Sequence, residues 1–316
     1  MSRAGKVCYN GHRHIVSVTK GLGERFMALF QIGNDKITIQ VDSMGAELKS
    51  LKRVDTGTEY MWEGNPVFWK RTSPVLFPLV GGLKNGGYLH DGRRYPMGQH
   101  GFARDRQFQL KSQTNREIWF TLQSDDESLQ NYPYEFLLEL GYELQENTLI
   151  VKWKVTNPAS GELYFSIGGH PAFRCPIVED TKQTDYRIRF DTKEKVISGI
   201  IKNGLMSDEK EVYTLENGYL PITEHLFDKD ALVIEEDQVK EVALIRPDGR
   251  AYLTVRFDAP LFGIWSPPGK NAPFICIEPW YGRCDALDFD GTWEERKWGQ
   301  CLASGESFEA SYQIIV

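Results

Sequence analysis

Apolar and polar residues alternate along most of the chain from about residue 36 onward. Ile37, Ile39 and Val41 point to one face of an extended segment, and Leu48 and Leu51 follow a break at Gly45. A period of two is typical of a strand with one buried face. The same pattern predicts strands over residues 107–110, 117–122, 135–143, 148–156, 162–167, 187–190, 232–235, 241–245, 251–257, 274–277 and 307–314.

Turn sequences separate these predicted strands. They combine Gly, Pro, Asn and Asp, at residues 85–87, 91–92, 157–158, 217–218, 247–249 and 267–269. Beyond residue 26, no stretch carries a helical stripe for more than about three turns. Many strands at short intervals predict an all-β fold, either a large antiparallel sandwich or a barrel.

Residues 1–26 stand apart from the strand pattern. They carry scattered cations without an apolar run or a small-residue cleavage site, so they do not resemble a secretory signal. We expect residues 1–26 to be a poorly ordered extension. Because no linker, compositional shift or repeat divides the remainder, we expect residues 27–316 to form a single domain.

Composition narrows the class of function. The chain has 316 residues, and its 37 Lys and Arg against 44 Asp and Glu give a net charge of −7. An acidic chain without a basic stripe is not expected to bind nucleic acid. The apolar runs fall far short of the roughly 18 residues of a membrane span. The 5 cysteines are odd in number and never two apart, which favours reduced thiols. We therefore expect a soluble, cytoplasmic protein.

Two ionisable residues occupy positions that favour function over an ordinary structural role. His170 lies between Gly168-Gly169 and Pro171, at the end of a predicted strand, where the backbone is held in an unusual conformation. Glu278 ends the apolar strand over residues 274–277. A carboxylate there is costly to bury unless it is paired or catalytic.

Further candidates are weaker when taken singly. Arg71 precedes a Pro-bounded apolar run, His100 and Arg104 lie four positions apart around a glycine, and Asp230 precedes an apolar strand. Ordinary surface and turn positions explain each of them as well.

Other chemistries find less support in the sequence. It contains no nucleophile elbow, no P-loop and no metalloprotease helix. His100, His170 and Glu278 would suit a metal ion if the fold brought them into one pocket, and this alternative stays open at this point.

Taken together and in this order, the segments resemble the aldose 1-epimerase (galactose mutarotase) family. The resemblance is greatest to its bacterial branch, which shares the Gln-His-Gly-Phe-Ala-Arg sequence of residues 99–104 with hexose-6-phosphate 1-epimerases. It runs from about Ile37 to the C-terminus and includes residues 45–48, 74–78 and 277–280, both His segments and the strand entry at Asp230. The resemblance implies a galactose mutarotase-like β supersandwich of large antiparallel sheets, with the sugar in an open cleft.

The resemblance also implies roles for the candidate residues. Glu278 is similar to the family's general base and His170 to its general acid. His100, Arg71 and Asp230 are similar to its sugar-hydroxyl binders. Opening a pyranose ring needs a base for the anomeric hydroxyl and an acid for the ring oxygen, and a carboxylate and an imidazole suit these tasks. We expect the pair to approach the sugar ring from opposite sides, without a cofactor or a metal.

Two further side chains are expected to contact the sugar. Arg104 adds a second guanidinium beside Arg71, and such a fork of donors suits phosphate oxygens. Trp280 offers an aromatic face for a sugar ring, as do Trp69, Trp265 and Tyr281.

The sequence therefore predicts an isomerase that interconverts the α and β anomers of a hexose. The alternatives are a hexose-6-phosphate 1-epimerase and a non-catalytic carbohydrate-binding protein of the same fold. The retained Glu278 and His170 favour catalysis. The expected partner is a small-molecule sugar, with neither nucleic acid nor membrane, and the protein is expected to be a monomer or a homodimer.

Overall fold

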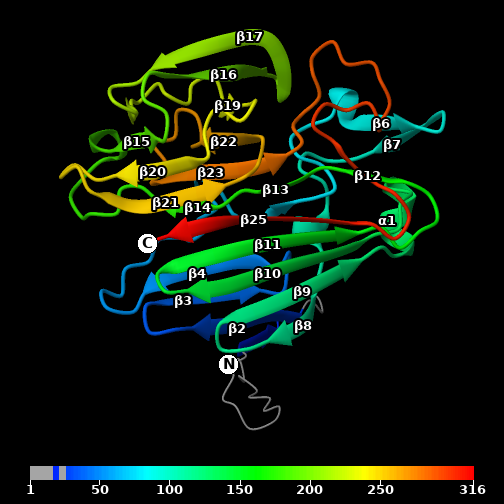
Figure 1. Ribbon diagram of the computed structural model, residues 1–316, viewed down its shortest axis with the longest axis horizontal. Coiled ribbons are helices and arrows are strands. Elements are labelled where there is room, and N and C mark those ends of the chain that lie inside the picture. The colour runs from blue at the N-terminus through cyan, green and yellow to red at the C-terminus, as the bar shows by residue number, and fades with distance from the viewer. Residues whose placement is uncertain (1–16, 21–25) are drawn as a thin grey trace.

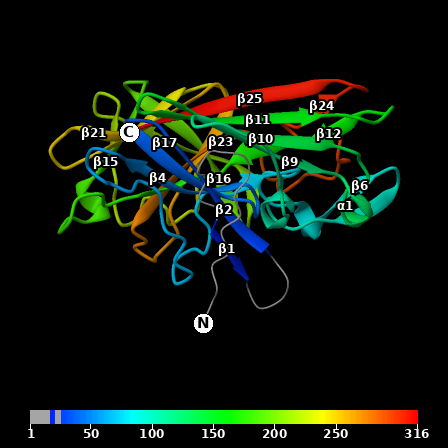
Figure 2. The same ribbon diagram turned by 90° about the horizontal axis from the view of Figure 1, so that it is seen from below.

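The alternating segments form antiparallel strands in the computed structural model, which describes residues 17–20 and 26–316 (Figure 1). The largest sheet has nine strands, and Figure 2 shows β25, β11, β10 and β9 in succession along one layer. In spatial order its strands are β18 (Tyr219–Pro221), β15 (Arg187–Phe190), β20 (Glu241–Ile245), β21 (Ala251–Phe257), β25 (Ser307–Ile315), β11 (Thr148–Thr156), β10 (Leu137–Gln145), β9 (Glu117–Gln123) and β8 (Gln109–Gln113).

An eight-stranded sheet carries the segments with the candidate chemistry. In spatial order its strands are β17 (Leu205–Thr214), β16 (Lys195–Lys202), β19 (Leu232–Ile234), β22 (Leu261–Trp265), β23 (Phe274–Tyr281), β13 (Ile167–Gly169) and β5 (Val75–Leu76), and β14 (Ala172–Arg174) also pairs with β23. Strand β23 thus lies in the interior of this sheet, paired with β22, β13 and β14.

Smaller elements complete the described part of the chain. A four-stranded sheet contains β1 (Ser17–Lys20), β2 (Phe26–Gly33), β3 (Ile37–Asp42) and β4 (Glu47–Arg53). The strand pairs are β6 (Gly87–His90) with β7 (Arg93–Pro96), and β12 (Leu163–Phe165) with β24 (Gln300–Leu302). The helices are α1 (Asp126–Asn131) and short 3-10 turns at Lys84–Gly86, Ala103–Asp105 and Gln183–Asp185. Among the described residues, no helix has the length and apolar character needed to cross a membrane.

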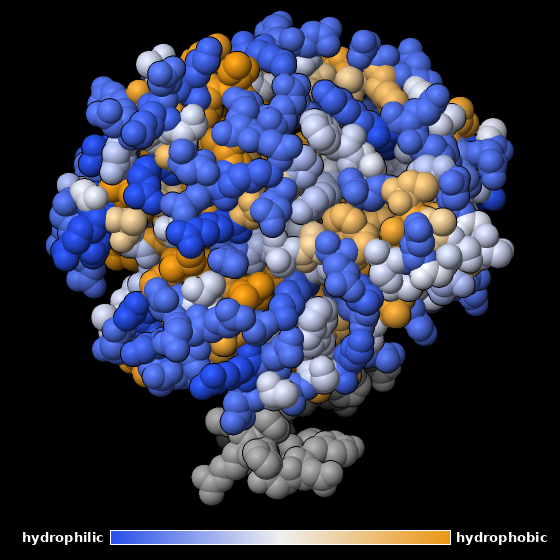
Figure 3. Space-filling model, in the orientation of Figure 1, coloured by the Kyte–Doolittle hydropathy of each residue, from blue (hydrophilic) through white to orange (hydrophobic). Residues whose placement is uncertain are grey.

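One hydrophobic core joins the three large sheets. It contains Ile39 from the four-stranded sheet, Leu140 and Val151 from the nine-stranded sheet and Ile277 from the eight-stranded sheet. The polar positions of the alternating strands face outward. The surface seen in Figure 3 is accordingly mostly hydrophilic, with apolar residues interspersed.

Strand β23 differs from most others because it is buried on both faces. Ile275 and Ile277 belong to the core between the sheets, whereas Phe274, Cys276 and Trp280 pack in separate clusters on the opposite face. Since side chains alternate along a strand, Glu278 shares that opposite face. The fold therefore presents the carboxylate away from the main core.

The prediction of an all-β fold with large antiparallel sheets is confirmed. The expectation that Glu278 ends its strand is wrong, because β23 continues to Tyr281 and holds the carboxylate inside the sheet. Four residues of the expected N-terminal extension form β1, which pairs with β2. Residues 1–16 and 21–25 lie outside the described residues, so the division at residue 26 stays a prediction.

Candidate active site

A cleft of about 710 Å³ opens on the outer face of the eight-stranded sheet. Loops between distant strands and the β16–β17 hairpin form its walls. The fold brings the predicted acid, base and principal sugar-binding residues to this cleft: Arg71, His100, Arg104, His170, Asp230, Glu278 and Trp280.

Glu278 is held on β23 by its neighbours in the sheet. It lies opposite Gly263 of β22, and a side chain at Gly263 would come within 2.5 Å of the Trp280 ring. Glycine therefore leaves the space that the Trp280 indole fills beside the carboxylate. Only 1% of Glu278 is exposed to solvent.

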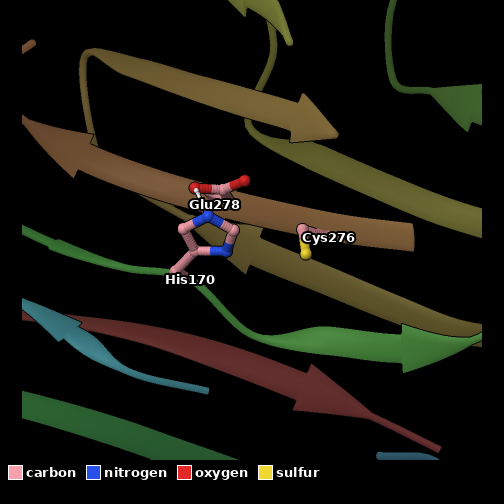
Figure 4. A group of neighbouring side chains, drawn as sticks. All are labelled: His170, Cys276 and Glu278. Carbon is pink, nitrogen blue, oxygen red and sulfur yellow. Dashed lines mark ion pairs between the residues drawn. The ribbon is translucent and has the colours of Figure 1, made fainter. Parts of the chain in front are cut away.

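His170 lies in the connection between β13 and β14, with its backbone fixed by a hydrogen bond from its N–H to the Pro74 carbonyl oxygen. The imidazole stacks on the Trp69 indole, with ring centroids 4.7 Å apart. Its Nε2 lies 3.3 Å from Oε2 of Glu278. Figure 4 shows the two side chains pointing toward each other, one from this connection and one from β23.

This contact changes one expectation about the catalytic pair. His170 and Glu278 do share one cleft, as expected, but they touch each other directly. A sugar ring therefore does not fit between them, and both groups must reach it from the same side.

Burial shifts the pKa values of the pair in opposite directions. Desolvation raises the pKa of Glu278 well above its usual range, and the negative charge of Asp230 adds to this rise. The Trp280 indole N–H opposes the shift from nearby, without meeting the geometry of a hydrogen bond. Desolvation, together with the charges of Arg104 and Arg71, lowers the pKa of His170 to about 3.

Burial therefore favours the uncharged forms of both groups, a protonated Glu278 and a neutral His170. Moving the carboxyl proton to the imidazole gives an ion pair with the same number of protons. One member can then give a proton while the other takes one.

His100 is fixed in an orientation that leaves one ring nitrogen as a donor. Its backbone has a left-handed φ of 65°, and its N–H donates to the Gly81 carbonyl oxygen. The Gly81 N–H in turn donates to Nδ1 at 3.1 Å. The neutral ring therefore carries its proton on Nε2. Burial, with the neighbouring His170 and Arg104, keeps the pKa of His100 well below its ordinary value.

The two predicted arginines share one carboxylate. Arg71 Nη2 donates to both oxygens of Asp105, at 3.0 Å each. Arg104 Nε lies 3.8 Å from the same carboxylate, and its Nη2 donates to the Gln99 carbonyl oxygen. Burial and the charge of Arg71 lower the pKa of Arg104 to about 10.

Asp230 stands at the entry to β19 with a left-handed φ of 75°. Its Oδ1 accepts a hydrogen bond from the N–H of Ala231. The carboxylate is half-buried and lines the cleft, where its charge acts on Glu278.

Sequence reasoning missed several residues of the cleft. Lys70, Lys270 and Arg283 add positive charge to its lining, and Met206 comes from the unpredicted β16–β17 hairpin. Behind the cleft lining, Cys276 was also missed beside Glu278, although a spacing of two on one strand was a signal for it. Tyr281 packs against the main core instead of lining the cleft, contrary to its expected part in sugar stacking.

The chain is similar in sequence and in structure to known proteins. The family model described as aldose 1-epimerase matches residues 28–314. The chain belongs to the aldose 1-epimerase family. The prediction of this family from the sequence is thereby confirmed.

Similar proteins come from Lactococcus lactis and from two Lactobacillus species. The plasmid-encoded protein LacX of Lactococcus lactis subsp. lactis is 30% identical over 296 residues, covering 90% of this chain and 98% of that protein. A galactose mutarotase related enzyme from Lactobacillus acidophilus superposes with a TM-score of 0.86 at 32% identity, covering 91% of this chain and 96% of its own. A galactose mutarotase-like protein from Lactobacillus casei gives a TM-score of 0.83 at 29% identity, covering 91% and 99% of the two chains.

Proposed function

We propose that this member of the aldose 1-epimerase family is a mutarotase that interconverts the α and β anomers of an unphosphorylated hexose. The observation that carries the proposal is the contact between His170 and Glu278 at 3.3 Å, on the wall of an open cleft. A pair that shares one proton suits a reaction in which one proton leaves the sugar and another joins it.

The steps follow from the two groups. Glu278 takes the proton of the anomeric hydroxyl, the C1–O5 bond breaks as C1 becomes a carbonyl, and His170 gives its proton to O5. Rotation about C1–C2 presents the other carbonyl face. The reverse transfers then close the ring as the opposite anomer and restore both groups, so no net oxidation or covalent intermediate occurs.

The remaining residues position the sugar. The Nε2–H of His100 and the guanidinium of Arg71 donate hydrogen bonds to hydroxyl groups, and the Asp230 carboxylate accepts them. The Trp280 indole lies on the same wall as Glu278 and offers its face to the ring.

Charge balance favours a neutral sugar. Asp105 pairs with Arg71 and lies close to Arg104, so it offsets positive charge that a phosphate group would otherwise engage. Arg71 then remains a hydrogen-bond donor for hydroxyl groups.

One observation favours a hexose 6-phosphate as the second candidate substrate. The Nε of Arg104 is buried without a hydrogen-bond partner, and Lys70 and Lys270 line the same cleft. An anionic substituent would satisfy that donor and offset the surrounding positive charge.

The decisive measurement is the rate of anomer exchange by NMR, or by a coupled assay, for free and 6-phosphorylated glucose and galactose at two salt concentrations. We expect the larger kcat/KM for a free hexose, with little dependence on salt. A strong, salt-sensitive preference for the phosphorylated sugars would establish the second candidate. Sugar binding without anomer exchange would show instead that the protein is a non-catalytic carbohydrate-binding protein.

A further inference from the structure

His170 and Glu278 of the cleft, with the buried Cys276 beside them, carry donor atoms that suit a soft divalent cation. His170, Cys276 and Glu278 bring an imidazole nitrogen, a thiol sulfur and a carboxylate oxygen within 4.8 Å of one another (Figure 4). We propose that these three residues bind one Zn²⁺ ion, and that the bound ion inhibits the enzyme by occupying its acid and its base.

The sheet itself brings the three donors together. Cys276 and Glu278 lie two positions apart on β23, so both project from the outer face of that strand. Strand β14 pairs with β23 so that Ala172 lies opposite Cys276. This register carries the preceding residues, including His170, over the same face. All three residues are buried, with exposed fractions of 7% for His170, 0% for Cys276 and 1% for Glu278.

The two ligand atoms that face each other are not satisfied by a hydrogen bond. Oε2 of Glu278 is buried, and its contact with Nε2 of His170 at 3.3 Å does not have the geometry of a hydrogen bond. Buried polar atoms are almost always hydrogen-bonded, so this oxygen needs a better partner. A cation bound by Nε2 and Oε2 together would supply it.

The spacing is close to that of a tetrahedral zinc site. Zinc bonds of about 2.0–2.3 Å place neighbouring ligand atoms roughly 3.3–3.7 Å apart. His170 and Glu278 already stand at 3.3 Å. The limit of 4.8 Å for the whole cluster leaves a closure of roughly 1 Å, within reach of small side-chain rotations.

The donor set also selects among cations. A thiolate is a soft ligand that favours zinc over magnesium or calcium, which prefer oxygen. The site differs from the metal alternative considered from the sequence, because Cys276 takes the place of His100. A coordinated imidazole and carboxylate can no longer exchange protons with a sugar, so the ion is an inhibitor and not a cofactor. The inhibitory effect rests on the proposed function, whereas the binding does not.

Binding is tested with Co²⁺, which reports a thiolate ligand through a charge-transfer absorption band. The full chain is treated with a chelator, dialysed and titrated with Co²⁺ and then Zn²⁺. We expect the band to saturate at one equivalent of cobalt and to disappear as zinc displaces it. It should persist in Cys301→Ser, which removes an exposed thiol, and be lost in Cys276→Ser.

Inhibition is tested on the same proteins. Zn²⁺ should inhibit the wild-type enzyme and Cys301→Ser alike, and Mg²⁺ should not. Loss of a ligand in Cys276→Ser should raise the inhibitory zinc concentration at least roughly tenfold, since even outer-shell substitutions cost about 10–100-fold in affinity.

Several outcomes would overturn the proposal. Absence of the cobalt band in the wild-type protein, or a band that survives Cys276→Ser, would refute the site. If Cys276→Ser does not fold, Cys276→Ala and Glu278→Gln replace it, and unchanged cobalt affinity in both would refute the site as well. Zinc binding without inhibition of measurable exchange would refute the inhibitory role. A protein without exchange activity that still shows the band would support the site and fail only the proposed function.

Discussion

The imidazole of His170 lies against the indole of Trp69, with 28° between the two ring planes. Trp69 is itself held, because its carbonyl oxygen accepts a hydrogen bond from Nε1 of Trp62 at 2.9 Å. Trp265 meets the His170 ring edge-on at 5.6 Å from another side. Aromatic contacts therefore fix the angle at which the imidazole faces Glu278.

Removing this support should impair turnover. We expect Trp69→Ala to lower kcat/KM by about 10–100-fold, because a displacement of about 1 Å in a catalytic group costs this much. Trp69→Phe keeps a flat ring under the imidazole and should retain most of the activity. Steady-state anomer exchange measures both variants, and equal losses in the two would contradict a stacking role.

The ability of Glu278 to take a proton should matter more than its shape. We expect Glu278→Gln to lower kcat by about 10²–10⁴-fold with little change in sugar affinity, because the amide fills the same space but takes no proton. Exchange kinetics and calorimetric binding separate the two effects. Glu179→Gln, at an exposed position, is the matched control and should behave as wild type. Near wild-type turnover in Glu278→Gln would exclude this residue as the base.

The pH profile should respond to Asp230. Activity needs the one proton held by the pair, and this proton is lost when pH rises through the raised pKa of Glu278. Because the charge of Asp230 contributes to that rise, Asp230→Asn should lower the pKa of Glu278. The alkaline limb of the profile should then move to lower pH, whatever the height of its plateau.

Profiles for this comparison are measured with a chelator present, so that no divalent ion occupies the pair. Asp228→Asn, at a nearby exposed position, is the control and should leave the limb in place. An alkaline limb that stays fixed or moves to higher pH in Asp230→Asn would contradict the assigned interaction.

A buried ion pair should stabilise one wall of the cleft. Arg296 Nε donates to Asp285 Oδ1 at 2.7 Å, with 3% and 4% of the two side chains exposed. Breaking such a pair leaves a buried charge uncompensated, so Asp285→Ala should reduce the free energy of unfolding by about 3–5 kcal/mol. Asp248→Ala removes the partner of the exposed Arg250 and should change the free energy of unfolding far less, because solvent screens an exposed ion pair. Denaturant unfolding measures the free energy of unfolding of both variants. Equal decreases in the two would contradict the larger contribution of the buried pair.

Turnover itself should need no metal. Acid and base groups suffice for ring opening, so exhaustive chelation should leave exchange rates unchanged, or raise them if zinc was bound. Loss of activity on chelation that a divalent ion restores would reverse this prediction.

Local pattern was enough to predict much of the fold. The segments 148–156, 187–190 and 251–257 coincide with β11, β15 and β21, since each has one face toward the core. Strand β22 was not predicted, because it is buried along almost its whole length and its sequence shows no alternation of apolar and polar residues. The charged edge strand β17 was not predicted either, because most of its residues are at least partly exposed and few of them are apolar. A period of two is visible only where the two faces of a strand meet different surroundings.

The sequence by itself determined the fold class, the family and the residue types that meet in the cleft. It could do so because alternation, turn residues and short motifs are local properties of the chain. Only the tertiary structure decided that His170 touches Glu278, that Asp105 pairs with Arg71 and that Cys276 lies beside the His170–Glu278 pair. These contacts join segments far apart in the chain, and the register of β13 and β14 against β23 fixes them. The register between strands depends on the packing of whole sheets, so it cannot be predicted from a local stretch of sequence.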